Sequence, residues 1–204
     1  SHAAAEVCAG NGIHVRIFES LRPTPELSFA VRYYGCQAGI NVTASHNPKE
    51  YNGYKVYWSD GAQLPPQHAA AIARELEQID IFTGVKTMDF DEAVSAGRIE
   101  IIGEETDRAF MAQVEAMIND RASVAKVADT FHMVYTPFHG CGWKLVPEAL
   151  TALGVKHLHC VPEQMVLDGD FPTVASPNPE NPEGFYLAID LADKVGADFI
   201  LGTD

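Results

Sequence analysis

Several kinds of pattern are missing from this sequence of 204 residues. It contains four cysteines, Cys8, Cys36, Cys141 and Cys160, but no Cys-x-x-Cys pair, which argues against a disulfide scaffold and favours a reducing compartment. No stretch reaches the roughly 20 apolar residues that a membrane span requires, and the N-terminus has no basic region followed by an apolar one. We therefore expect a protein of the cytoplasm that has no membrane partner.

Positive charge is also scarce in this chain. There are 14 Lys and Arg residues against 28 Asp and Glu residues, which gives a formal charge of −14. This balance argues against a non-specific grip on nucleic acid or on anionic lipid. A local basic site for one small anion is still compatible with it.

Alternating strand and helix patterns are what the sequence does contain, and they predict an α/β fold. Residues 13–19 and 37–44 are typical of strands, with a helix expected between them from Thr24 to Gly35. A second series of alternating elements follows residue 104. We predict two consecutive α/β domains with mixed, mainly parallel sheets, the first at 1–90 and the second at 91–204, because residues 80–103 mix short polar and glycine-containing pieces.

A small polar cluster, Thr43-Ala44-Ser45-His46-Asn47-Pro48, follows the second predicted strand. Ligands of open α/β sheets usually bind beyond the carboxyl ends of strands, where such a cluster would lie. A serine hydroxyl needs a base, a metal or an attached phosphoryl group to react near neutral pH, and a histidine is a suitable acid or base. Lys55 could steer a phosphate. The alternative is an Asn-Pro turn with solvated side chains.

The exact order of residues resembles the phosphoserine loop of the α-D-phosphohexomutase family, which includes phosphoglucomutases and phosphomannomutases. Four further segments fit the family in the same order, and the stretch 53–63 is most similar to the branch that acts on glucose and pentose phosphates. These segments are Pro23-Thr24-Pro25, Thr136-Pro137-Phe138-His139-Gly140-Cys141-Gly142, residues 171–180, and Gly202-Thr203-Asp204.

The resemblance implies a role for each matching residue. Ser45 would carry the phosphoryl group, donate it to a sugar monophosphate and take another back from the resulting bisphosphate. His46 and Lys55 match positions implicated in proton transfer. Asp204 matches the first aspartate of the family's Mg²⁺ loop, with the phosphoserine at Ser45 as a further ligand. The expected partners are glucose 1-phosphate and glucose 6-phosphate, or mannose or pentose phosphates, and a glucose 1,6-bisphosphate type of activator is expected.

The sequence also departs from the family pattern. The rest of the metal loop and the family's third and fourth domains do not follow Asp204, so we expect a fragment of a phosphosugar mutase that is inactive alone. The alternative is a non-catalytic module that binds sugar phosphates.

Other polar segments are weaker candidates for function. Residues 138–142 are expected to form a tight turn lining the cleft rather than a nucleotide site. His157-Leu158-His159-Cys160 could ligate a metal from one strand face, but a structural role is favoured because no further ligand is evident. For residues 177–180, a role as a rigid connection and a role near the cleft are equally favoured. Glu100, Glu104, Glu105 and Asp107 are interpreted as the start of a helix.

Overall fold

The computed structural model describes residues 1–204 and divides into two compact units. Unit 1 comprises Ser1–Ser20, Thr24–Val42 and Tyr54–Thr106, and unit 2 comprises Leu21–Pro23, Thr43–Gly53 and Asp107–Asp204. No helix of the chain combines the length and the apolar character needed to cross a lipid bilayer.

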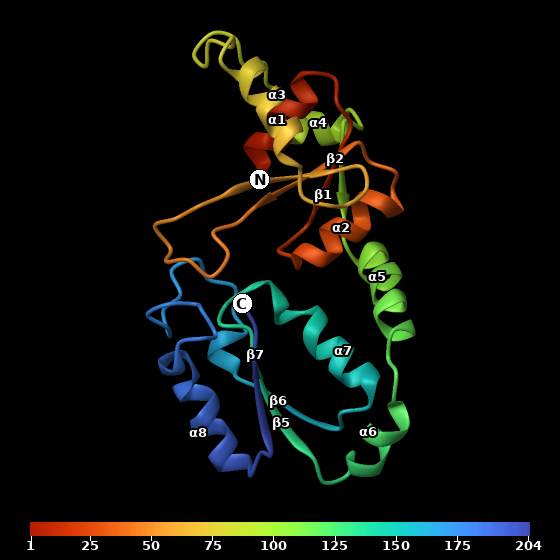
Figure 1. Ribbon diagram of the computed structural model, residues 1–204, viewed down its shortest axis with the longest axis vertical. Helices are drawn as coiled ribbons and strands as arrows, with labels where there is room; N and C mark the ends of the chain where they lie inside the picture. Colours follow the sequence, from red (N-terminus) through yellow and green to blue (C-terminus); the bar gives the residue numbers. More distant parts are fainter. The chain divides into compact units, whose positions relative to one another are not determined.

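Unit 1 contains two separate pairs of strands with helices around them (Figure 1). One pair is parallel and joins β1 to β4, and the other is an antiparallel hairpin of β2 and β3. Its elements are α1 (His2–Gly10), β1 (Val15–Phe18), α2 (Thr24–Tyr33), β2 (Ala38–Val42), β3 (Tyr54–Trp58), α3 (Pro66–Leu76), α4 (Phe90–Ser95) and β4 (Ile99–Ile102).

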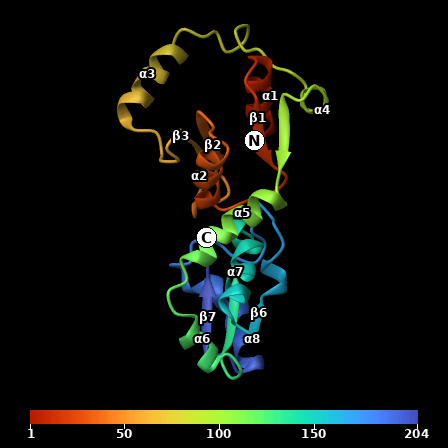
Figure 2. The same cartoon turned by 90° about the vertical axis from the view of Figure 1, so that its right-hand side faces the viewer.

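Small residues build the core of unit 1, because they let α1 and α4 approach each other and β4. Ala5 and Ala9 of α1 meet Ala93 of α4 and Ile99 of β4, and all four are buried. By contrast, α3 has no buried residue, and Figure 2 shows it standing apart from α1 and β1. The buried contacts of unit 1 therefore centre on α1, α4, β1 and β4.

Unit 2 is a three-layer arrangement around a parallel sheet of order β6-β5-β7. Figures 1 and 2 show α7 and α8 on opposite faces of this sheet. Val134 of β5 and Val161 are buried against Ala188 and Ala192 of α8. Its elements are α5 (Glu104–Ala116), whose first residues belong to unit 1, α6 (Arg121–Val127), β5 (His132–Thr136), η1 (Cys141–Trp143), α7 (Leu145–Leu153), β6 (His157–Cys160), η2 (Pro162–Gln164), η3 (Pro182–Phe185), α8 (Tyr186–Val195) and β7 (Phe199–Gly202).

The predicted α/β class with parallel strands is confirmed. The order of pairing was not foreseen, because β1 pairs with β4 across more than 80 residues and β2 turns back on β3. The elements α4, β4 and α6 were not predicted, since each is too short to show a clear periodicity. The domain division between residues 90 and 91 stays a prediction, and the pairing with β1 places Ile99–Ile102 in unit 1.

Candidate functional site

The polar cluster found in the sequence lies in a loop, residues 43–53, that belongs to unit 2. At its base the Thr43 N–H donates to the Gly53 carbonyl at 3.0 Å. A Cβ on Gly53 would lie 2.6 Å from the Thr43 carbonyl oxygen, so this closure needs glycine. Inside the loop, the backbone and side-chain amides of Asn47 both donate to the Ala44 carbonyl, at 3.2 and 2.8 Å. The turn expected from Asn-Pro therefore forms.

Ser45 has a left-handed backbone, with φ of 54°, which is unusual for a residue other than glycine. Its N–H donates to the Thr43 hydroxyl at 2.9 Å, and this bond holds the strained residue in place. The Ser45 Oγ lies 3.5 Å from the Nδ1 of His46. Strained residues of this kind cluster at active sites, so the conformation is consistent with a functional serine.

Asp204 reaches the same histidine nitrogen, because its Oδ2 lies 3.7 Å from His46 Nδ1. The structure thus brings together Ser45, His46 and Asp204, three of the residues singled out in the sequence. The side chains of His46 and Asp204 are 52% and 46% exposed, so a ligand in solution can reach them. A hydroxyl, an imidazole and a carboxylate at one point can exchange a proton.

Lys55, the fourth predicted residue, lies on β3 in unit 1. It pairs in register with Asn41 of the neighbouring strand and is half-buried. The other three predicted residues belong to unit 2.

The end of β7 is fixed by bonds to the central strand of the sheet. The Thr203 N–H donates to the Thr136 carbonyl at 3.0 Å, and the Thr203 hydroxyl bonds the Tyr135 hydroxyl at 2.8 Å. Burial raises the pKa of Tyr135 to about 12, so this phenol stays protonated at neutral pH. A Cβ on Gly140 would lie 3.1 Å from the carbonyl carbon of Asp204. Asp204 is therefore packed against the glycine loop that follows β5.

That loop is the tight turn expected from residues 138–142. The Gly140 N–H donates to the Pro137 carbonyl at 2.7 Å, and Phe138 and His139 both have a positive φ, of 46° and 66°. Burial, followed by the charge of Asp204, raises the pKa of the Cys141 thiol. A protonated thiol is a poor nucleophile, so Cys141 is not a candidate for covalent catalysis.

The histidines of β6 contact a third histidine on β5. His132 Nδ1 lies 3.3 Å from His159 Nε2, and the His132 ring stacks on His157 with centroids 4.3 Å apart. No group of three or more His, Cys, Asp or Glu side chains in the structure is arranged to hold a metal ion. The structural role favoured for residues 157–160 stays a prediction.

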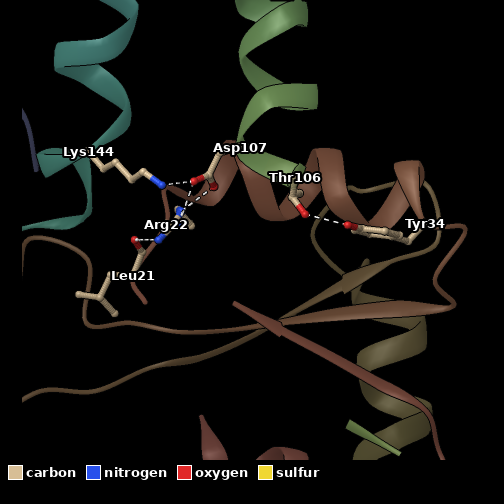
Figure 3. Close-up of polar contacts among 6 residues, drawn as sticks. All are labelled: Leu21, Arg22, Tyr34, Thr106, Asp107 and Lys144. Atoms are coloured by element: carbon tan, nitrogen blue, oxygen red, sulfur yellow. Dashed lines mark hydrogen bonds and ion pairs between the residues drawn. The ribbon is translucent and has the colours of Figure 1, made fainter. Parts of the chain in front are cut away.

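A buried ion cluster around Asp107 was not foreseen (Figure 3). Asp107 accepts from Arg22 at 2.7 and 2.9 Å and from Lys144, and the side chains of Arg22 and Asp107 are 2% and 4% exposed. The sequence pattern around Asp107 indicated only an acidic helix start, and α5 does begin at Glu104. Partners 85 and 37 residues away leave no periodic signal in a sequence.

Segment 177–180 is a tight connection. The Asn178 side chain accepts from the Glu180 N–H at 2.9 Å, and its carbonyl accepts from the Asn181 N–H at 3.0 Å. A role beside the cleft stays a prediction for this segment.

Two family models match the chain. Residues 1–81 match the α/β/α domain I of phosphoglucomutase/phosphomannomutase, and residues 108–204 match domain II. A phosphoglucomutase from Staphylococcus saprophyticus is 38% identical over 100% of this chain and 36% of its own length. A probable phosphomannomutase from Haemophilus influenzae is 35% identical over 98% of this chain and 39% of its own length. The chain thus spans little more than a third of these relatives.

Solved structures show the same fold at low identity. A protein from Thermus thermophilus whose name places it among phosphomannomutases superposes with a TM-score of 0.72 at 22% identity, over 100% of this chain and 42% of its own. The phosphoglucomutase pp63/parafusin from Paramecium, in its open form, gives a TM-score of 0.64 at 20% identity, over 94% and 37% of the two chains. With both domain models matched in order, the chain belongs to the phosphoglucomutase/phosphomannomutase family.

Proposed function

We propose that the protein carrying this chain is a phosphosugar mutase that moves a phosphoryl group between two hydroxyls of a sugar through a phosphoserine at Ser45. The observation that carries the proposal is the meeting of Ser45 Oγ and Asp204 Oδ2 at one nitrogen of His46, at 3.5 and 3.7 Å. The relatives named phosphoglucomutase and phosphomannomutase suggest glucose or mannose phosphates as the substrate class, and pentose phosphates are a further option.

The reaction consists of two transfers. In the first, the bond between Ser45 Oγ and phosphorus breaks while a free sugar hydroxyl forms a new bond to phosphorus. The hydroxyl proton passes to a base, and Ser45 Oγ takes up a proton. His46, next to Ser45, and Lys55 are the proposed proton carriers. In the second, Ser45 Oγ loses its proton and bonds the other phosphoryl group of the bisphosphate, whose bond to the sugar breaks, and the released sugar oxygen takes up a proton. A bisphosphate sugar such as glucose 1,6-bisphosphate would serve as activator by phosphorylating an empty Ser45.

The oxygen donors at this point fit Mg²⁺, which prefers carboxylate and phosphate oxygens. Asp204, half-exposed beside His46, and the phosphorylated Ser45 would hold the ion. When bound, Mg²⁺ neutralises charge on the transferring phosphoryl group, which is the main demand of this chemistry. The fit supports the metal proposal, with the remaining ligands supplied by water or by other parts of the protein.

We further propose that the 204 residues alone do not complete the cycle, since they span 36% of a relative that carries the phosphoglucomutase name. We also propose a cytoplasmic location, because sugar phosphates are cytoplasmic metabolites. A division into domains at residue 90 is retained as part of this proposal.

The test is turnover of glucose 1-phosphate by the longest natural form of the protein, with Mg²⁺ and a trace of glucose 1,6-bisphosphate. Ser45→Ala should abolish turnover, while Ser95→Ala, an exposed serine on α4, should leave it unchanged. A Ser45→Ala protein that keeps its activity would exclude the phosphoserine mechanism.

A further inference from the structure

A chain of hydrogen-bonded polar side chains that the proposed reaction does not use includes the glycine loop packed against Asp204. Gln164 and Thr136 are fully buried and His139 is 3% exposed. Thr136 Oγ1 bonds Gln164 Oε1 at 2.5 Å, Gln164 Nε2 bonds Thr173 Oγ1 at 3.1 Å, and Thr173 Oγ1 bonds His139 Nε2 at 2.9 Å. His139 Nδ1 ends the chain on the Val166 carbonyl at 2.8 Å.

The direction of each of these hydrogen bonds follows from its partners. A carbonyl can only accept, so His139 Nδ1 carries the proton that points at Val166. The Gln164 amide nitrogen donates to the Gly184 carbonyl at 3.2 Å and to Thr173, which leaves the Thr173 hydroxyl to donate to His139 Nε2. The Thr136 hydroxyl donates to Gln164 Oε1. Each side-chain polar atom of the network thus has a partner, and such networks fix one arrangement of a core.

The network holds a strained stretch of backbone. Phe138 and His139 are consecutive residues with positive φ, and residues in that region cost of order 1–3 kcal/mol each unless their surroundings hold them. Here the His139 N–H donates to the Gln164 carbonyl at 2.9 Å, and the Phe138 N–H donates to Thr136 Oγ1 at 3.2 Å. The glycine loop therefore takes its shape from the buried Gln164 and Thr136.

Two members of the network, His139 and Thr173, are close in sequence to residues that contact the candidate site. On one side Gly140 packs against Asp204, as described above. On the other, Thr173 is close in sequence to Asp170, whose carboxylate pairs with Lys49 of the 43–53 loop at 3.0 Å. Within unit 2, the network is therefore joined along the chain to the glycine loop that packs against Asp204 and to the segment that pairs with the Ser45 loop.

We propose that the network of Thr136, Gln164, Thr173 and His139 is a positioning device that sets Asp204 and the Ser45 loop relative to each other; the inference rests on the proposed mutase function. A network that served stability alone would lower the unfolding temperature on mutation without disturbing His46 or Asp204. A positioning network changes the site in molecules that are still folded.

The decisive variant is Thr173→Val, which keeps the shape of the side chain and removes the hydroxyl that links Gln164 to His139. Thr173→Ser restores the hydroxyl. Thr151→Val is the matched control, because its hydroxyl bonds only its own helix, at the Pro147 carbonyl, 2.8 Å away. NMR of the 204-residue chain with ¹⁵N-labelled histidine reads the His139 tautomer and the environment of His46 separately.

We expect Thr173→Val to shift the His46 ring signals and to weaken broadening of the Asp204 signals by Mn²⁺, used as a probe for the metal. Thr173→Ser should restore both, and Thr151→Val should change neither. When Thr173→Val is made in the longest natural form, kcat should fall roughly 10- to 100-fold and KM should stay within about twofold of the wild-type value, since small misplacements of a reacting group cost this much.

Unchanged His46 and Asp204 signals in a folded Thr173→Val chain would overturn the positioning role, even if Ser45→Ala confirms the mutase. Conversely, a Ser45→Ala protein that still turns over substrate would overturn the mutase proposal, and the NMR result for Thr173→Val would be unaffected. If Thr173→Val does not fold, Thr173→Ala gives the same test, because it also removes the hydroxyl that links Gln164 to His139. It should shift the His46 ring signals in the same way, and unchanged His46 signals in a folded chain would again overturn the proposal.

Discussion

Asp107 shows how strongly a buried carboxylate depends on its partners. It is 3% exposed and is bonded by both Arg22 and Lys144 in unit 2 (Figure 3). Removing one member of a buried ion pair leaves the other charge without compensation, which costs far more than breaking an exposed pair. The structure of unit 2 therefore depends on a cluster that sequence patterns do not show.

Replacing this carboxylate gives the first prediction. Asp107→Ala should lower the free energy of unfolding by about 3–5 kcal/mol, because the buried guanidinium of Arg22 loses both carboxylate oxygens as acceptors. Urea unfolding followed by circular dichroism measures the change. Asp129→Ala, which breaks an exposed pair with Lys156, is the control and should change the unfolding midpoint little. Equal effects of the two substitutions would contradict the assigned importance of burial.

A second prediction concerns the acid side of the pH range. Asp120 caps α6, where its carboxylate accepts from the N–H and the hydroxyl of Ser123 at 2.9 and 2.5 Å. The bond from the Ser123 hydroxyl, and to a smaller extent the bond from its N–H, lowers the pKa of Asp120 from its ordinary 3.8. A lowered pKa in the folded state means that the stabilisation is present above about pH 4 and is lost as pH falls through the folded value.

The Ser123 amide should therefore exchange with solvent faster as pH falls below about 4, after correction for intrinsic exchange rates. NMR hydrogen exchange measures this, and Asp120→Asn should remove the pH-dependent part. Asp89, which caps α4 through the Glu92 N–H, is the comparison within the same molecule. A Ser123 amide whose protection is the same in wild type and Asp120→Asn at every pH would exclude the cap as the cause.

At the scale of elements, helix ends were predicted more reliably than strand partners. The helix expected from Thr24 to Gly35 is α2, which spans Thr24–Tyr33, and Gly154 ends α7 with a left-handed φ of 113°. The signal is local, because a glycine after an apolar periodic stretch is enough to end a helix. The partner of β1 could not be predicted in this way, since β4 lies far along the chain and its four residues show no clear pattern.

The same glycine supports a third prediction. Gly154→Ala should lower the free energy of unfolding by roughly 1–2 kcal/mol, because an alanine Cβ clashes with its own backbone in this region of φ. The surrounding space is not the cause, since the nearest atom, on Val124, would lie 3.7 Å away. Gly169→Ala is the control, with open space and no positive φ, and should be close to neutral. Thermal unfolding of the two variants measures the loss of stability. Both replace glycine by alanine, so the difference between them reports the backbone strain at residue 154.

At the candidate site, too, residues within short sequence motifs were found from the sequence, and residues joined by long-range hydrogen bonds were not. The Thr-Ala-Ser-His-Asn-Pro run singled out Ser45 and His46, and the resemblance to the family's metal loop singled out Asp204. The structure brings all three together. Their roles stay predictions. His139, Gln164 and Thr173 were not singled out as a group, because their bonds join segments 9 to 34 residues apart whose spacing has no regular period.

At the scale of the whole molecule, the described cores belong to separate units. The cluster around Ala93 and Ile99 contains only residues of unit 1, and the cluster around Val134 and Ala188 contains only residues of unit 2. Hydrophobic clusters defined by contact usually mark cooperative parts of a chain. Each unit therefore has the packing needed to unfold on its own.

The last prediction follows from this separation. Ile99→Ala removes a side chain that is 2% exposed in the unit 1 core and should cost about 2–5 kcal/mol there. Ile101→Ala, on the same strand but 53% exposed, is the matched control and should cost far less. Hydrogen exchange should show Ile99→Ala reducing protection in α1, β1, α4 and β4, while amides of β5, β6 and β7 keep theirs. Equal loss of protection in both sets of elements would show that the two cores unfold as one, because a shared transition lowers every slow amide by the same free energy.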